Sequence, residues 1–315
     1  MTDAAIWNRY WHYDRIASCF DGAGASNYDD SVAAGWRAFF AGLPAGAQIL
    51  DLCTGNGAAA LIAAEVGRSQ AKGFAIHAVD RADIDPPAYV TRHGDLYPRI
   101  AFRGGVEVEA LPFADASFDA AISQYGVEYS DLARSVPELL RVLAPGGRIR
   151  LVVHAAEGVV AAGAREMIAD ADMLLDKIDL PGAAARCFEA VTAVERAGGD
   201  KPAADRAFAA FQSALERTAD YVPLASDSLM VRNSGAVLLD TFSRRAAFDV
   251  DQLLAKAGEV RTEIAAHRGR LTALIEAALD QTGAEALAAR LGGRCTALTS
   301  AQGLIGYEAE ARLPD

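Results

Sequence analysis

The sequence predicts an α/β protein in which helices cover both faces of a doubly wound, mostly parallel sheet. Three observations support this fold class: short apolar runs alternate with helical stretches, a glycine-bearing turn follows the first run, and the runs are apolar nearly throughout. Strands that alternate with helices at this spacing form parallel sheets. Strands that are covered on both faces lack the polar alternation of half-exposed strands.

Composition sets the class of protein. The chain has 315 residues, 52% hydrophobic and 23% charged, as in a globular protein. Its formal net charge of -12 disfavours a nucleic-acid partner, because phosphate backbones repel an acidic chain. No long apolar run occurs, and charges interrupt the first residues, so we expect neither a membrane partner nor a secretory leader. Cys19, Cys53, Cys187 and Cys295 lie far apart, which predicts reduced thiols and a cytoplasmic protein.

Four regions follow from the pattern along the chain. Residues 1–45 are rich in aromatic side chains and predict a helical lid. Residues 46–155 carry the alternation of strands and helices, with strands expected at 47–53, 74–80, 118–126 and 147–154. Residues 156–290 are rich in Ala, Leu, Glu and Arg and predict a helical cap or insertion, and residues 291–315 predict a β-hairpin that completes the sheet.

The longest helix is expected over 251–279. Apolar residues recur there in alternating steps of four and three, which is the heptad period. This pattern fits one helix packed on a core. A helical hairpin partner or the seam of a homodimer is the alternative.

The strongest local signal is the turn Asp-Leu-Cys-Thr-Gly-Asn-Gly at 51–57, between an apolar strand and a helix of small residues. Gly55 and Gly57 allow a sharp turn and the close approach of a ligand to the backbone. Asp51, ahead of the turn, repels a diphosphate and attracts an amino group. Asp80 ends the next strand, where an acid suits the two hydroxyls of a ribose. An amine and a ribose without a diphosphate match S-adenosylmethionine.

On these residues the chain resembles the class I S-adenosylmethionine-dependent methyltransferases. Asp51 and the two glycines match the D-x-G-x-G-x-G turn of that family, with Cys53 in place of the first glycine. Residues 106–119 resemble the block in which an acid precedes Leu-Pro-Phe and then Phe-Asp, and residues 140–148 resemble the turn that enters the fifth strand. The three motifs occur in the family's order and cover about 46–155.

The resemblance implies a Rossmann-like sheet of seven strands with a helical insertion, an enzyme of EC class 2.1.1, and S-adenosylmethionine as cofactor. It places the methionine part on the glycine turn, the ribose on Asp80, the adenine beside Glu107 or the backbone of Val108, and the methyl near the end of the fourth strand. The residues implied to bind the cofactor are Asp51, Cys53, Gly55, Asn56, Gly57, Asp80, Arg81, Glu107, Val108, Ser123 and Gln124.

Catalytic residues are harder to assign, because methyl transfer needs alignment and the exclusion of water, and a base only for a protonated nucleophile. His154 ends the fifth strand, at the edge where ligands of such sheets bind, and is our general-base candidate; a structural histidine is the alternative. Residues 13–21 resemble the helix before the core of ubiquinone and menaquinone methyltransferases, so Tyr13 and Tyr28 are candidate cofactor contacts, or packing residues. Tyr13 is also the second catalytic candidate, after His154. No set of side chains has metal-ligand spacing, so no metal is expected.

We therefore expect a methyltransferase acting on a small-molecule acceptor. Three alternatives stay open: an NAD-dependent oxidoreductase, an RNA or protein methyltransferase, and a non-catalytic protein that binds S-adenosylmethionine. Asp51 argues against the first, and the absence of Asn-Pro-Pro-Tyr after the fourth strand argues against methylation of base amino groups. The helical region is expected to cover the substrate pocket, to form a homodimer interface, or both.

Overall fold

The computed structural model describes residues 3–17, 27–28 and 30–315. Contacts divide the chain into a sheet unit, Met1–Ala161 with Leu274–Asp315, and a helical unit, Ala162–Ala273. The helical unit is shorter at both ends than the helical region expected over 156–290, because the residues up to Ala161 and those from Leu274 onward belong to the sheet unit. Part of the segment 13–21, whose resemblance to a lid helix was noted above, lies outside the described residues.

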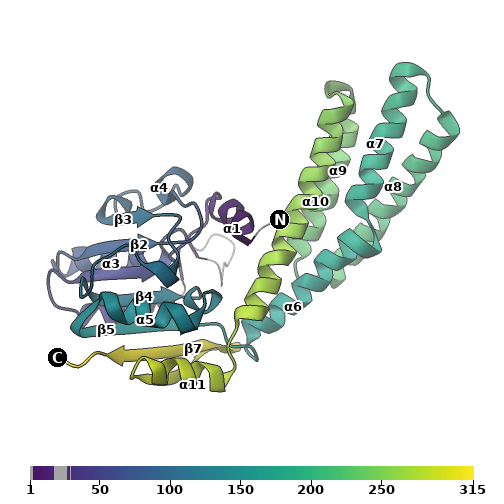
Figure 1. Cartoon of the computed structure of the whole chain (residues 1–315). Coiled ribbons are helices and arrows are strands. Elements are labelled where there is room, and N and C mark those ends of the chain that lie inside the picture. The colour runs from purple at the N-terminus through teal and green to yellow at the C-terminus, as the bar shows by residue number, and fades with distance from the viewer. Residues whose placement is uncertain (1–2, 18–26, 29) are drawn as a thin grey trace. The chain divides into compact units, whose positions relative to one another are not determined.

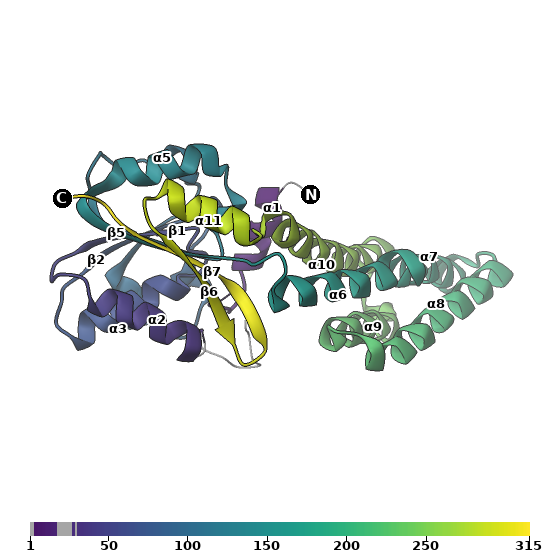
Figure 2. The same ribbon diagram turned by 90° about the horizontal axis from the view of Figure 1, so that it is seen from below.

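The sheet has seven strands in the order β3-β2-β1-β4-β5-β7-β6. The first five strands in the chain are parallel, and β7 runs antiparallel to β5 (Figure 1). The strand β6 closes a hairpin with β7 (Figure 2). This arrangement confirms the predicted sheet and the predicted terminal hairpin. The strands are β1 (Gln48–Leu52), β2 (Ala75–Val79), β3 (Ile100–Arg103), β4 (Phe118–Gln124), β5 (Leu143–Val153), β6 (Arg294–Ser300) and β7 (Gly303–Arg312).

Helices cover both faces of the sheet, as Figure 2 shows. On one face lie α2 (Asp30–Ala41) and α3 (Ala58–Ser69), and on the other α5 (Leu132–Val142) and α11 (Gln281–Arg290). Neighbouring strand residues serve opposite cores: Ile49 packs in the core under α2 and α3, and Leu50 in the core under α5 and α11. This is the reason for the apolar runs in the sequence, because alternate side chains point to opposite faces.

One strand of the sheet was not expected from the sequence. Ile100–Arg103 pairs with β2 in parallel and forms the edge of the sheet. It has only four residues, of which two are exposed, and its apolar run is limited to three residues. Short edge strands lack the hydrophobic signal of central ones.

Around the sheet, the sheet unit also contains the short helices α1 (Asp3–Trp11) and α4 (Pro86–Tyr89). It also has single helical turns at Tyr97–Arg99, Val108–Ala110 and Val127–Tyr129. The last two of these turns follow β3 and β4 and lie at the carboxyl edge of the sheet.

The helical unit is built from α7 (Leu180–Ala197), α8 (Lys201–Tyr221), α9 (Ser228–Ser243), most of α6 (Val159–Asp172) and most of α10 (Val250–Ala277). The long helix was expected over 251–279, so its position is confirmed within two residues. Its positions Leu253, Ala257, Val260 and Ile264 are buried in a core with Phe188 and Phe211. Among the described residues, no helix combines the length and apolar character needed to cross a membrane.

Candidate functional site

The turn after β1 takes the form that the sequence predicts. Cys53, Gly55 and Gly57 all have positive φ, at 54°, 53° and 86°. Cys53 thus adopts the left-handed conformation that a glycine takes there readily, at a cost of about 1–2 kcal/mol for a residue with a side chain. The turn is therefore retained despite the missing glycine.

Asp80, at the end of β2, joins two turns at the carboxyl edge. One of its oxygens accepts a hydrogen bond from the backbone N–H of Gly55, and the other from that of Ala82, each at 2.8 Å. Burial raises the pKa of this carboxyl group. A carboxylate can accept about four hydrogen bonds, so Asp80 keeps acceptor capacity for a ligand.

Asp51 lies within the fold beneath the same turn. Only 1% of the residue is exposed, and it accepts a hydrogen bond of 2.6 Å from the hydroxyl of Thr54. Burial raises the pKa of Asp51 to about 7, partly opposed by the Thr54 hydrogen bond. Its charge therefore changes near neutral pH.

A pocket opens at this edge of the sheet unit. It is bordered by the ends of three strands, by α1, and by the turns after β3 and β4. Its described lining residues are Trp7, Trp11, Cys53, Asp80, Arg81, Ala82, Val106, Glu107, Val108, Glu109, Tyr125, Gly126, Tyr129 and Ser130.

Two tryptophans of α1 form one wall of the pocket. Trp7 and Trp11 stack on each other with ring centroids 6.3 Å apart, and Trp7 meets the ring of Tyr129 edge-on at 5.5 Å. Trp11 lies directly on Gly55, where a Cβ atom would come within 2.4 Å of the indole ring. Gly55 is thus required for the contact between the turn and α1.

Asn56 holds the segment after α1 to the glycine turn. Its side-chain amide donates hydrogen bonds to the carbonyl oxygens of Trp11 at 3.0 Å and Arg15 at 2.8 Å. The side chain is fully buried and lies outside the pocket lining. The side-chain amide of Asn56 therefore anchors this segment, and its contact with the cofactor stays a prediction.

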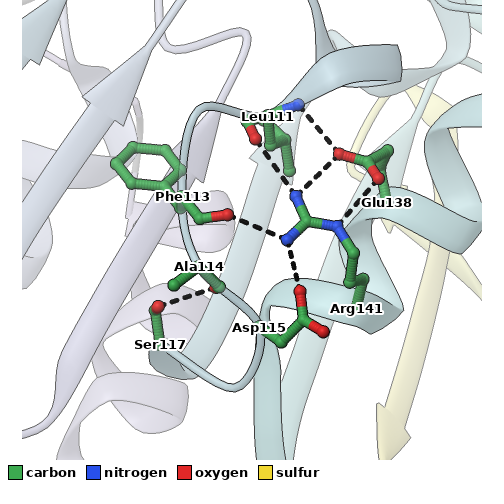
Figure 3. Close-up of polar contacts among 7 residues, drawn as sticks. All are labelled: Leu111, Phe113, Ala114, Asp115, Ser117, Glu138 and Arg141. Atoms are coloured by element: carbon green, nitrogen blue, oxygen red, sulfur yellow. Dashed lines mark hydrogen bonds and ion pairs between the residues drawn. The ribbon is translucent and has the colours of Figure 1, made fainter.

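A network around Arg141 of α5 fixes the loop after the turn at Val108–Ala110, as Figure 3 shows. The guanidinium group donates to both oxygens of Glu138, to Asp115, and to the carbonyl oxygens of Leu111 and Phe113. Glu138 in turn accepts from the backbone N–H of Leu111 at 3.0 Å. Arg141 therefore holds the loop that follows Glu107 and Val108.

Glu128 and His154 form a buried pair next to the pocket segment that follows β4. One oxygen of Glu128 lies 2.7 Å from Nδ1 of His154 and accepts from its backbone N–H at 2.9 Å. The imidazole ring stacks on Tyr125 at 4.3 Å and is 1% exposed as a residue. The pair joins the ends of β4 and β5 and supports the segment 125–130, which lines the pocket.

The structure brings five of the expected cofactor residues to the pocket wall: Cys53, Asp80, Arg81, Glu107 and Val108. Asp51 and the glycines Gly55 and Gly57 lie in or beneath the turn next to it, and Tyr13 and His154 also lie outside its described lining.

Ser123 and Gln124, expected near the methyl group, have other partners. The hydroxyl of Ser123 donates to the carbonyl of Leu52 and accepts from the N–H of Val127, each at 3.0 Å. The side chain of Gln124 accepts from the indole N–H of Trp36 at 2.6 Å. Neither residue lines the pocket, because both side chains are used to pack the end of β4.

Some pocket residues were missed by the sequence analysis. Trp7 and Trp11 are four residues apart and so share one helix face. This spacing is the sequence signal that could have identified them, in place of Tyr13, as pocket residues. Tyr129 and Glu109 lie in single helical turns, where no periodicity shows the direction of a side chain.

Comparison with known proteins identifies the core of this site. Residues 50–151 match the family model described as a methyltransferase domain. This part of the chain is similar to a methyltransferase domain. The match confirms the predicted class I core, and it includes the glycine turn, Asp80 and the Arg141 network.

Relatives of the methyltransferase domain include enzymes named for quinones. The 2-phytyl-1,4-naphtoquinone methyltransferase of Thermosynechococcus vestitus is 34% identical over 113 residues, which are 35% of this chain and 47% of that protein. The demethylmenaquinone methyltransferase of Thermus thermophilus is 37% identical over 110 residues, 32% of this chain and 44% of that protein. The YcgJ protein of Bacillus subtilis is a solved structure with 26% identity, covering 39% of this chain and 51% of that one, at a TM-score of 0.33. The chain spans less than half the length of the curated relatives that it matches.

Proposed function

We propose that the protein is an S-adenosylmethionine-dependent methyltransferase that acts on a small-molecule acceptor. The observation that carries the proposal is Asp80, whose carboxylate lies on the pocket wall and is tied to the glycine turn through Gly55. This acid and turn lie within the methyltransferase domain at 50–151. The domain match supports the activity, and the pocket supports an acceptor of small size.

The residues present fit the cofactor. Asp80 offers carboxylate oxygens to ribose hydroxyls, and Glu107 and Val108 border the place for the adenine, beside Arg81. Asp51 places a carboxyl group beneath the turn that would receive the methionine part. The acids that line the pocket suit a ligand that carries a sulfonium and an ammonium group.

When bound, S-adenosylmethionine supplies a methyl group on a positively charged sulfur, which is already a good leaving group. The chain mainly has to orient the acceptor and exclude water. Trp7, Trp11, Tyr125 and Tyr129 provide apolar walls for both tasks. Cys53 also lines the pocket, but burial raises the pKa of its thiol well above the ordinary value, so this thiol stays protonated and does not compete as a nucleophile.

The roles of His154 as a general base and of Tyr13 as a cofactor contact stay predictions. Glu128 bonded to Nδ1 would set the tautomer and orientation of the imidazole, as acids do for catalytic histidines. A cytoplasmic location, a roof formed by the helical unit, and a homodimer formed through it are also retained as parts of the proposal. Their support is the acidic, cysteine-poor composition and the helical insertion between β5 and β6.

A ligand titration tests the proposal. We expect S-adenosylhomocysteine to raise the thermal midpoint of the chain and NADH to leave it unchanged, because a ligand that binds only the folded state stabilises it. Stabilisation by NADH alone would favour the oxidoreductase alternative and contradict the proposal.

Turnover provides the second measurement. We expect transfer of labelled methyl groups to members of a small-molecule panel, which includes a reduced naphthoquinone because of the two quinone enzymes among the relatives. Methylation of RNA with strongly salt-dependent affinity would move the acceptor class to nucleic acid. Cofactor binding without turnover of any acceptor would favour the alternative of a non-catalytic protein that binds S-adenosylmethionine.

A further inference from the structure

The charge of the pocket limits the acceptor that it can take. Three carboxylates line it, from Asp80, Glu107 and Glu109, whereas Arg81 is the one basic residue among its described lining residues. The residues outside the described part of the chain, 1–2, 18–26 and 29, contain no Lys, Arg or His. The walls that the sheet unit contributes are therefore negative whatever the placement of those residues.

Four aromatic residues and Glu109 share the lining of this pocket with the residues proposed to hold the nucleoside. Arg81 directly follows Asp80 and belongs with the nucleoside side, together with Glu107 and Val108. The lining also holds Trp7, Trp11, Tyr125 and Tyr129, which together with Glu109 we call the aromatic wall. The ring of Trp7 contacts those of Trp11 and Tyr129. Aromatic faces attract organic cations that lie within about 6 Å of the ring centre.

Building on the proposed function, we infer that the methyl acceptor carries a positive charge, such as an amine in its ammonium form, and is held by the aromatic wall and Glu109. An acceptor with a carboxylate or phosphate would lose its hydration on entering the pocket and would lie next to carboxylates. The free energy of desolvating the anion would then not be offset by an opposite charge. A cation gains both from the rings and from the carboxylates.

The pKa of the Cys53 thiol, which lines the pocket, is raised by burial and by the same negative charges. After burial, the largest causes that raise the pKa of its thiol are the charges of Asp80, Glu128, Asp51 and Glu109. The field that opposes a thiolate at this place also opposes an anionic acceptor and favours a cationic one.

The test compares three probes of similar size on the whole chain saturated with S-adenosylhomocysteine. Benzyltrimethylammonium is the cation, benzyl alcohol the neutral probe and phenylacetate the anion. We expect calorimetry to show the cation bound about tenfold more tightly than the alcohol, and phenylacetate bound least. Phenylacetate or the alcohol binding as tightly as the cation would overturn the inference.

A charge-only variant sharpens the test. Glu109→Gln removes the charge but keeps an oxygen for the hydrogen bond of 2.8 Å from the backbone N–H of Asp131. We expect a loss of about three- to tenfold in affinity for the cation, with the alcohol unchanged. Asp220→Asn, at an exposed site of α8, is the matched control and should change neither.

A ring variant tests the aromatic wall. Tyr129→Leu should weaken binding of the cation by about fivefold, whereas Tyr129→Phe should keep it, because only the first removes the ring. Equal affinities for the two variants would contradict a role of the ring. Binding of S-adenosylhomocysteine without any preference for the cation would overturn the inference alone, and failure of S-adenosylhomocysteine to bind would overturn the proposed function with it.

Discussion

The two units of the molecule bury different kinds of polar side chain. In the sheet unit, Asp51, Asp80, Glu128 and His154 are ionisable and less than 10% exposed. In the helical unit, most buried polar residues are hydroxyls that bond one turn back along their own helix, as Thr218 does to Ala214. Burying ionisable groups is costly, so such groups are retained where they serve binding or catalysis. The helical unit also buries the carboxylate of Asp170, which accepts hydrogen bonds from the hydroxyl of Tyr221 and from the backbone N–H of Asp227. Most of the buried ionisable side chains therefore lie in the sheet unit.

The hydrophobic core and the ion pairs of the helical unit are also separate from the matched domain. In the helical unit, apolar residues such as Phe188 and Phe211 form the core, and ion pairs such as Arg268 with Asp172 and Asp176 lie toward the surface. The matched methyltransferase domain, 50–151, lies entirely within the sheet unit. The helical unit therefore adds a separate hydrophobic core to a domain that carries the matched residues.

The largest effect is expected from opening the core of the helical unit. Phe211→Ala should lower the free energy of unfolding of this unit by about 3–5 kcal/mol, because the ring is 1% exposed and its removal leaves a cavity. Scanning calorimetry should show the loss, and titration well below the transition should show unchanged affinity for S-adenosylhomocysteine. Leu224→Ala, where the side chain is 77% exposed, is the control without effect. Loss of affinity for S-adenosylhomocysteine in the folded variant would contradict the view that ligand binding depends on the sheet unit alone.

An intermediate effect is expected at the pocket wall. Asp80→Ala should weaken binding of S-adenosylhomocysteine by about 1–3 kcal/mol, the scale of hydrogen bonds to a charged group. Asp220→Ala, on the surface of α8, should leave the affinity unchanged. Calorimetric dissociation constants for both variants provide the measurement, and an unchanged constant for Asp80→Ala would remove this residue from the ribose site.

The smallest effect is expected from pH. Because burial raises the pKa of Asp51 to about 7, the empty protein holds a proton there as pH falls, and an ammonium group on a ligand must displace it. Affinity for S-adenosylhomocysteine should therefore fall as pH drops through 7, by up to about tenfold per unit. The pKa of Asp80 is raised as well and adds to the slope.

Asp51→Asn separates the two contributions to this pH dependence. It should weaken binding at pH 8 and flatten most of the slope between pH 8 and pH 6. For the empty protein the sign is opposite: a raised pKa stabilises the fold at low pH, and this stabilisation is lost as pH rises through about 7. A slope that survives unchanged in Asp51→Asn would assign the titration to another group.

Strands and the glycine turn could be predicted from the sequence because central strands and left-handed glycines leave strong local patterns. The edge strand Ile100–Arg103 could not, because half of its side chains face solvent. Asp80 was placed correctly on the pocket wall because strand ends of a parallel sheet meet at one edge. Ser123 and Gln124 follow the same rule, yet their side chains bond to Leu52 and Trp36, and only tertiary packing decides that direction.

The side-chain amide of Asn56 links the amino-terminal helix to the glycine turn. It grips the carbonyl oxygens of Trp11 and Arg15 while its own backbone belongs to the glycine turn. These hydrogen bonds hold the end of the first helix and the residues after it to the glycine turn. Deleting the first fifteen residues would leave the buried amide of Asn56 without the carbonyl oxygens of Trp11 and Arg15. Truncation at the amino terminus should therefore destabilise the glycine turn.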